Sequence, residues 1–293
     1  MTSGSQPTPR LSRRVRFPGG CGFELAGIVD LAAGFHDRAP LPTDISEPTQ
    51  TPMPKSPVLV FSHCFTCNKD LKAIVRISRS LAGTGATVLR YDMTGLGGSG
   101  GDFSWTNFTT NVADLRAAIR FASQELGPVV GLIGHSFGGA ASLAVAGNPQ
   151  DAAENLRAVA TLAAPSETHH LATLMERRNP AIATAGVGAV EIGGRAWTIR
   201  REMLQDFRSH HLSELITRIA LPLMVLHSPA DETVGFEEAI RIYQLASIRP
   251  PDTLAPPVSL VALDRADHLL GNRAADLTYV AELLAAFFKR HHL

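Results

Sequence analysis

The strongest constraint on the fold of this chain is an alternation of short apolar runs with amphipathic segments, which begins at residue 58. Each run is continuous and rich in branched side chains, as Val58–Ser62 and Val129–Ile133 are. Between the first runs, Leu71, Ile74 and Ile77 recur at helical spacing. The other expected strands are Ala86–Tyr91, Leu156–Ala163, Leu223–Leu226 and Val258–Leu263, and the last expected helices are Phe236–Ala246 and Ala274–Lys289. This alternation predicts an α/β fold with a mostly parallel central sheet flanked by helices on both faces.

Around this alternation, the sequence predicts one domain over residues 12–293, preceded by a flexible polar tail over residues 1–11. Two further strands, Val15–Phe17 and Glu24–Leu31, are expected before the alternation. The segment over residues 36–57 is dense in proline, which excludes a helix or a central strand and predicts a surface loop.

The segment over residues 166–221 interrupts the alternation. Within it, Val190–Ile192 and Trp197–Arg200 flank Gly193-Gly194, a pair that favours the tight turn of a β-hairpin. We expect this segment to be a small lid or cap inserted over the end of the sheet, where it would shape a pocket and exclude water.

Composition limits the partners that the protein can have. Among its 293 residues, 27 Lys and Arg balance 27 Asp and Glu, so no large field attracts nucleic acid or anionic lipid. No apolar run is long enough to cross a bilayer, and residues 1–14 lack the apolar stretch of a signal peptide. The three cysteines are too few for a secreted disulfide scaffold. These features predict a cytoplasmic protein and leave its oligomeric state open.

The sharpest motif is Gly134-His135-Ser136-Phe137-Gly138-Gly139, which lies between an apolar strand and a helix of small residues. This strand–turn–helix context is that of a nucleophile elbow, in which flanking glycines let two chain segments cross closely. The alternative is a chance G-x-S-x-G in a glycine-rich chain. The context favours Ser136 as a nucleophile, while His135, its neighbour on a tight turn, is expected to be structural.

A serine nucleophile needs a base to take its proton and an acid to orient that base. His268 follows the last expected strand and is the expected base. Asp231 follows the strand Leu223–Leu226 and is the expected acid, because functional groups in open α/β sheets gather at the carboxyl ends of strands. The competing acids are Glu232, Asp264 and Asp267, and His63 and His227 are expected to bond loop backbone.

The loop after Val58–Ser62 should supply one of two backbone N–H groups of an oxyanion hole. We expect this donor to be the amide of Phe65, with that of Cys64 as an alternative, and the second donor to be the amide of Phe137. Cys64 and Cys67 also form a C-x-x-C pair. This spacing leaves two interpretations, a redox or metal role and two small side chains packed beside a pocket.

These residues resemble the α/β-hydrolase superfamily over nearly the whole chain. More narrowly, the segments 62–72, 91–97, 227–231 and 266–270 resemble the hydrolase half of bacterial hydrolase–OsmC fusion proteins. In those fusions a thiol-peroxidase-like domain follows, whereas this chain is too short to contain one. The resemblance implies an α/β-hydrolase fold and ester hydrolysis through a serine triad, with no cofactor and no metal.

The sequence therefore predicts a carboxylesterase-type serine hydrolase that acts on a small-molecule acyl ester through an acyl-enzyme intermediate. A thioesterase, a peptidase or an acyltransferase would use the same triad, and the fold alone does not choose among them. Two other classes stay open: a thiol redox protein that uses Cys64 and Cys67, and a silent binding module on the same scaffold.

Overall fold

The computed structural model describes residues 12–32, 56–148, 150, 154–248 and 256–291. The tail expected over residues 1–11 and most of the proline-dense segment lie outside the described residues.

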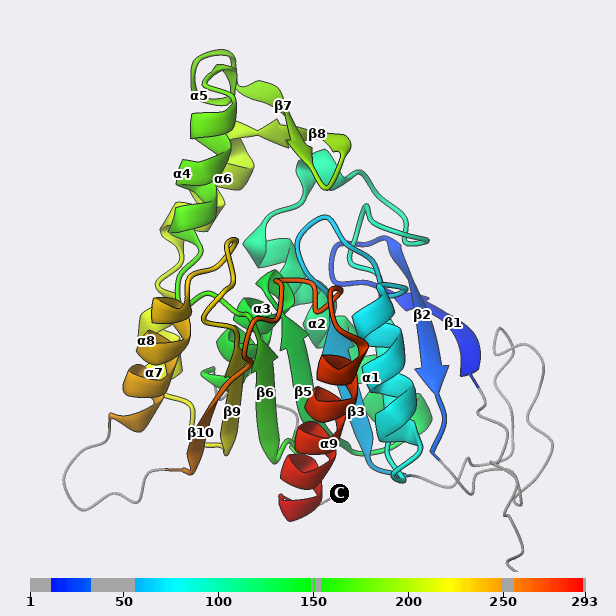
Figure 1. Cartoon of the computed structure of the whole chain (residues 1–293). Helices are drawn as coiled ribbons and strands as arrows, with labels where there is room; N and C mark the ends of the chain where they lie inside the picture. The colour runs from blue at the N-terminus through cyan, green and yellow to red at the C-terminus, as the bar shows by residue number, and fades with distance from the viewer. Residues whose placement is uncertain (1–11, 33–55, 149, 151–153, 249–255, 292–293) are drawn as a thin grey trace, which may run out of the picture.

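The centre of the molecule is an eight-stranded sheet with the strand order β1-β2-β4-β3-β5-β6-β9-β10 (Figure 1). Its strands are β1 (Ser12–Pro18), β2 (Glu24–Asp30), β3 (Val58–Ser62), β4 (Thr87–Tyr91), β5 (Val129–His135), β6 (Ala158–Leu162), β9 (Leu223–His227) and β10 (Val258–Ala262). Six neighbouring strands run parallel to one another, in the order β4, β3, β5, β6, β9 and β10. In contrast, β1 pairs antiparallel with β2, and β2 pairs antiparallel with β4. This confirms the expected mostly parallel sheet.

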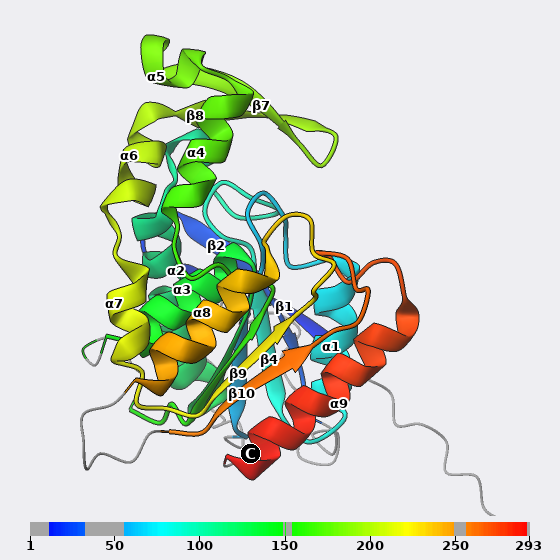
Figure 2. The ribbon, with the colours of Figure 1, turned by 60° about the vertical axis from the view of Figure 1, so that its left-hand side comes forward.

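Helices cover both faces of the sheet (Figures 1 and 2). One face is covered by α1 (Lys72–Ala82) and α9 (Ala274–Arg290), and the other by α2 (Phe108–Phe121), α3 (Phe137–Ala146) and α8 (Phe236–Ser247). Along β3, Leu59 and Phe61 pack with the first set of helices, while Val58 and Val60 pack with the second. Because helices pack on both faces of the sheet, both sides of the central strands are buried. This burial explains why the sequences of these strands are continuously apolar.

Between β6 and β9 the chain leaves the sheet and forms a separate group of elements. These are α4 (His169–Arg178), α5 (Ala181–Ala185), β7 (Val187–Ile192), β8 (Arg195–Arg200), α6 (Arg201–Ser209) and α7 (Leu212–Thr217). The hairpin expected around Gly193-Gly194 is present, because β7 and β8 pair antiparallel and both glycines have positive φ angles. Figures 1 and 2 show α4, α5, α6 and the hairpin beyond the carboxyl ends of the parallel strands.

Two short helical segments complete the described elements, the 3₁₀ helix η2 (Phe103–Trp105) and the π-helical turn η3 (Ala122–Leu126). No helix in the described ranges is both long enough and apolar enough to span a bilayer.

Candidate active site

Ser136 lies at the sharp turn between β5 and α3. Its φ of 52° and ψ of −117° are strained for a residue with a side chain. The Ser136 amide donates to the carbonyl of Leu162 on β6 at 2.8 Å, which fixes the turn to the neighbouring strand. The residue is 8% exposed, so its hydroxyl is held at the end of the sheet with limited access to water.

The glycines of the motif are required by close contacts between chain segments. A Cβ atom on Gly134 would lie 2.3 Å from the carbonyl oxygen of Gly138. A Cβ atom on Gly138 would lie 2.4 Å from the carbonyl oxygen of His63, in the loop after β3. Because both contacts are with backbone atoms, neither position accommodates a larger residue without movement of the turn.

The structure brings Ser136, His268 and Asp231 together from three separate strand ends. His268 Nε2 lies 3.0 Å from Ser136 Oγ, and His268 Nδ1 lies 2.8 Å from Asp231 Oδ2. A carboxylate accepts hydrogen bonds, so Nδ1 carries the imidazole proton and Nε2 is left to accept the serine proton. The arrangement is that of a nucleophile, a general base and an orienting acid.

Asp231 is held as an anion. Its burial acts to raise the pKa, but the hydrogen bond and the charge of His268 and the amides of Val234 and Thr233 outweigh that effect and lower the pKa below its usual value. Those two amides donate to Asp231 Oδ1 at 3.0 and 2.8 Å, respectively. The competing acid Asp267 instead accepts from the amides of Gly271 and Asn272.

Three further histidines lie buried around these residues with structural contacts. The Nε2–H of His135 donates to the carbonyl of His268 at 2.7 Å, so the neighbour of Ser136 supports the backbone of His268. The Nε2–H of His227 donates to the carbonyl of Val234 at 2.7 Å, in the loop that carries Asp231. These contacts agree with the expectation that His135 is structural and that His227 bonds loop backbone, but no sequence signal indicates which carbonyl groups the two rings bond.

The third buried histidine, His63, fixes the start of the expected oxyanion loop. Its Nδ1–H donates to the carbonyl of Cys64 at 2.8 Å, and its Nε2 accepts from the amide of Met93 at 3.1 Å. Among the described residues, the amides of Cys64, Phe65 and Phe137 have no hydrogen-bond acceptor. Each is therefore available to a substrate oxygen, and the choice between Cys64 and Phe65 stays open.

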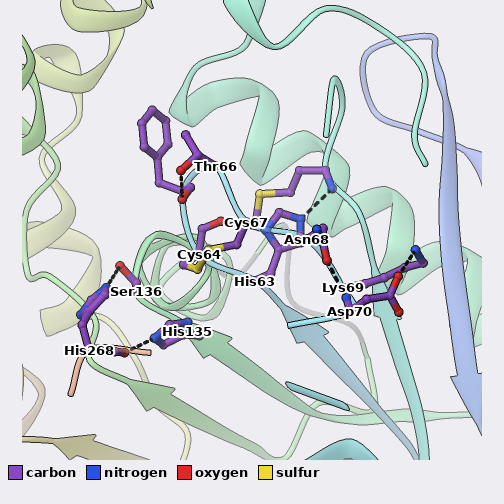
Figure 3. Close-up of a disulfide and its surroundings, with 12 residues drawn as sticks. His63, Cys64, Thr66, Cys67, Asn68, Lys69, Asp70, His135, Ser136 and His268 are labelled. Atoms are coloured by element: carbon purple, nitrogen blue, oxygen red, sulfur yellow. Dashed lines mark hydrogen bonds and ion pairs between the residues drawn. A yellow bond between two sulfur atoms is a disulfide. The ribbon is translucent and has the colours of Figure 1, made fainter. Parts of the chain in front are cut away.

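The C-x-x-C pair is joined by a disulfide, which the sequence interpretation of two packed small side chains did not predict. Cys64 and Cys67 are bonded at 1.98 Å, and Cys21 is the free cysteine of the described residues (Figure 3). No group of three or more His, Cys, Asp or Glu side chains within the described part of the chain is arranged to hold a metal ion.

Aromatic rings connect the nucleophile turn, the loop after β3 and the segment between β6 and β9. Phe65 packs against Phe137 and Phe103 at centroid distances of 5.3 Å in each case. Trp197 on β8 packs against Phe103 at 4.7 Å, and Phe207 on α6 packs against Phe137 at 5.2 Å. Trp105, in the same 3₁₀ helix as Phe103, is 63% exposed and does not share this burial.

The family model of serine aminopeptidase, S33, matches residues 55–210, a range that contains the nucleophile turn and the loop after β3. The chain belongs to this family. As a member of the S33 family it is an α/β-hydrolase, in agreement with the sheet order and the elbow.

Solved structures of other α/β-hydrolases cover almost the whole chain. The esterase domain of a Rhodothermus marinus protein is 36% identical to this S33 member, with a TM-score of 0.68 over 96% of this chain and 99% of that one. Est1E from Butyrivibrio proteoclasticus with bound ferulic acid is 17% identical, with a TM-score of 0.74 over 94% of this chain and 99% of that one. The second likeness, at low identity, concerns the fold alone. No curated protein sequence matches the chain.

Proposed function

We propose that the protein is a carboxylesterase-type serine hydrolase that cleaves small-molecule acyl esters through Ser136, His268 and Asp231. The observation that carries the proposal is the continuous hydrogen-bonded path from Ser136 Oγ through the His268 ring to Asp231 Oδ2, at 3.0 and 2.8 Å. The esterase domain at 36% identity supports an ester substrate. The motif from Ser62 to Lys72 supports the narrower assignment to the hydrolase half of hydrolase–OsmC fusions.

In the proposed reaction, Ser136 Oγ attacks the ester carbonyl while His268 Nε2 takes the hydroxyl proton. Asp231 stabilises the imidazolium that forms. The amide of Phe137, at the start of α3, and that of Phe65 or Cys64 stabilise the oxyanion of the tetrahedral intermediate. His268 then protonates the leaving alcohol, and water repeats the sequence to release the acid and regenerate Ser136.

Substitution of the nucleophile tests this proposal. Ser136→Ala removes the attacking oxygen, so kcat for p-nitrophenyl butyrate should fall on the order of 10⁶-fold. Ser142→Ala is the matched control, because Ser142 is buried in the same helix but donates to the carbonyl of Gly138. The control should keep most of its activity and its labelling by a fluorophosphonate. Unchanged turnover in Ser136→Ala, or labelling that does not need Ser136, contradicts the proposal.

A second candidate is hydrolysis of peptides from their amino end, which the description of the S33 family model favours. It uses the same triad, and so do a thioesterase and an acyltransferase. A panel of acyl esters, acyl-CoA thioesters and aminoacyl amides, measured as kcat/KM with wild type and Ser136→Ala, separates these reactions. The proposed activity requires the esters to have the highest kcat/KM.

A further inference from the structure

We propose that the Cys64–Cys67 disulfide positions the oxyanion amide of the loop after β3, and that a dithiol which reduces it lowers the turnover of esters. The inference rests on the proposed function, because it concerns the oxyanion hole of that same site. It gives the C-x-x-C pair a role within the hydrolase rather than a redox activity of its own.

The disulfide constrains the part of the loop that carries the proposed oxyanion amide. The bonded residues flank Phe65 and Thr66, so the candidate amide of Phe65 lies within the covalent ring that the disulfide closes, and the candidate amide of Cys64 directly precedes that ring. The Cys67 amide also donates to the carbonyl of Cys64 at 3.2 Å, which makes the segment a tight turn. Figure 3 shows this turn beside Ser136 and His268.

The backbone inside the turn is held in an unfavourable conformation. Thr66 has a φ of 61°, in the left-handed region that a β-branched residue rarely occupies. Within the described residues, its hydroxyl donates only to the adjacent carbonyl of Phe65, at 2.7 Å. With the disulfide open, Thr66 is free to rotate to a negative φ, and this rotation would re-orient the preceding peptide units and the amide they present to the substrate.

The loop is anchored independently on both sides of the disulfide. Before it, His63 is fully buried and bonds the backbone through both ring nitrogens. After it, Lys69 bonds Asp92 through its amide at 2.7 Å and its ammonium at 3.0 Å. Arg90 donates to the Lys69 carbonyl at 2.8 Å. Because these anchors do not need the disulfide, reduction should release residues 64–67 without unfolding the sheet.

The exchange reaction can begin at the more accessible sulfur. Cys67 is partly exposed, whereas Cys64 is 3% exposed. A thiolate of a small dithiol attacks Cys67 Sγ, the S–S bond breaks, and Cys64 leaves as a thiolate that takes up a proton. The second thiol of the reagent then displaces Cys67. The reagent becomes a cyclic disulfide, and its two electrons and two protons reside on the two cysteine thiols.

The experiment compares oxidised and reduced wild type with two variants. Protein treated with dithiothreitol and freed of reagent under anaerobic conditions is assayed with p-nitrophenyl butyrate, and released thiols are counted. We expect kcat to fall about tenfold with little change in KM, less than the 10²–10³-fold cost of losing an oxyanion donor entirely. Inhibition by a boronic acid, whose adduct is tetrahedral, should weaken by a similar factor, and reoxidation should restore both.

The double variant Cys64→Ser, Cys67→Ser should show the low kcat of the reduced protein whether or not dithiothreitol is present. Cys21→Ser is the matched control, because it removes the free thiol between β1 and β2 and keeps the disulfide. It should respond to reduction as wild type does. Burial raises the pKa of the Cys21 thiol to about 11, so this cysteine should itself react slowly.

Two results overturn the inference: equal kcat in the two states once two thiols have been released, or a fall in kcat accompanied by loss of the folded circular dichroism spectrum. The failure of the proposed function looks different. In that case neither state hydrolyses the ester or is labelled by a fluorophosphonate at Ser136, whereas the inference requires complete, if slower, labelling in both.

Discussion

At the scale of single residues, backbone strain gathers around the site. The described non-glycine residues with positive φ are Thr66, Ser136, Ala163, Arg265 and Leu270. Every one of them follows the carboxyl end of a parallel strand, and three of them, Ser136, Arg265 and Leu270, belong to the segments that carry Ser136 and His268. Strain of this kind persists only where surrounding contacts determine the conformation, and here those contacts orient the reacting groups.

The close crossing of the Ser136 turn and the loop after β3 constrains Gly138. In a helix, Gly→Ala usually stabilises by up to about 1 kcal/mol. At Gly138 the new methyl carbon would lie 2.4 Å from the His63 carbonyl oxygen, which displaces the loop that holds the oxyanion amide. We therefore expect Gly138→Ala to lower the free energy of unfolding by about 2 kcal/mol, measured in urea, and kcat by more than tenfold.

Gly100→Ala provides the control for this prediction. Its added methyl would have its nearest neighbours at 3.6 Å, an ordinary contact, so both its stability and its kcat should stay close to wild type. If Gly138→Ala were as stable and as active as Gly100→Ala, the close approach of the two loops would not constrain the site.

At the scale of elements, the sequence predicts the sheet well because both of its faces are buried. The runs predicted for β3, β9 and β10 match the observed strands to within one residue at each end. Strand β5 extends two residues beyond the apolar run, to His135. Gly134 and His135 pair with β6 without being apolar, so hydrophobicity alone does not mark that boundary.

The segment between β6 and β9 could not be assigned because its elements are short and bury few residues. Helix α4 buries only Ala172 and Met175, so it shows no clear apolar stripe. The turn at Gly193-Gly194 could be predicted because the signal, two consecutive glycines between two apolar runs, lies in the turn itself. The bonds from the amides of Thr233 and Val234 to Asp231, and the Cys64–Cys67 disulfide, have no such signal, because they depend on the detailed conformation of single loops and on the oxidation of two thiols. Asp231, the acid expected from the sequence, is the residue whose carboxylate contacts His268.

The hairpin β7–β8 is attached to the rest of the molecule through Trp197. This side chain is 9% exposed and packs on Phe103 of η2, with the Arg195 guanidinium 4.4 Å from its ring centre. Trp197→Ala should lower the free energy of unfolding by about 3 kcal/mol in urea, because it leaves a large cavity between the hairpin and η2. Trp105→Ala, at an exposed ring that contacts Arg200, should cost less than about 1 kcal/mol. Equal costs would mean that the hairpin does not depend on this contact.

At the scale of the whole molecule, three buried histidines lie at the carboxyl ends of β3, β5 and β9. Burial lowers the pKa of His63, His135 and His227, in His135 to about 3. Each ring donates a hydrogen bond to a backbone carbonyl as a neutral group. The loops of the site are thus held together by imidazoles that the folded protein does not protonate near neutral pH.

This arrangement makes the fold sensitive to acid in a defined window. Below pH 6.5 the unfolded chain takes up protons on these histidines, whereas the folded protein does not until the pH approaches their lowered pKa values. The unfolding free energy should be at its full value above pH 6.5 and fall as the pH drops, by up to about 1.4 kcal/mol per pH unit from His135, with further losses from His63 and His227. Urea unfolding at pH 7, 6 and 5 measures this slope. His135→Gln should reduce it, and His169→Gln, at a side chain that is 58% exposed, is the matched control. An unchanged slope in His135→Gln would place the proton uptake elsewhere in the molecule.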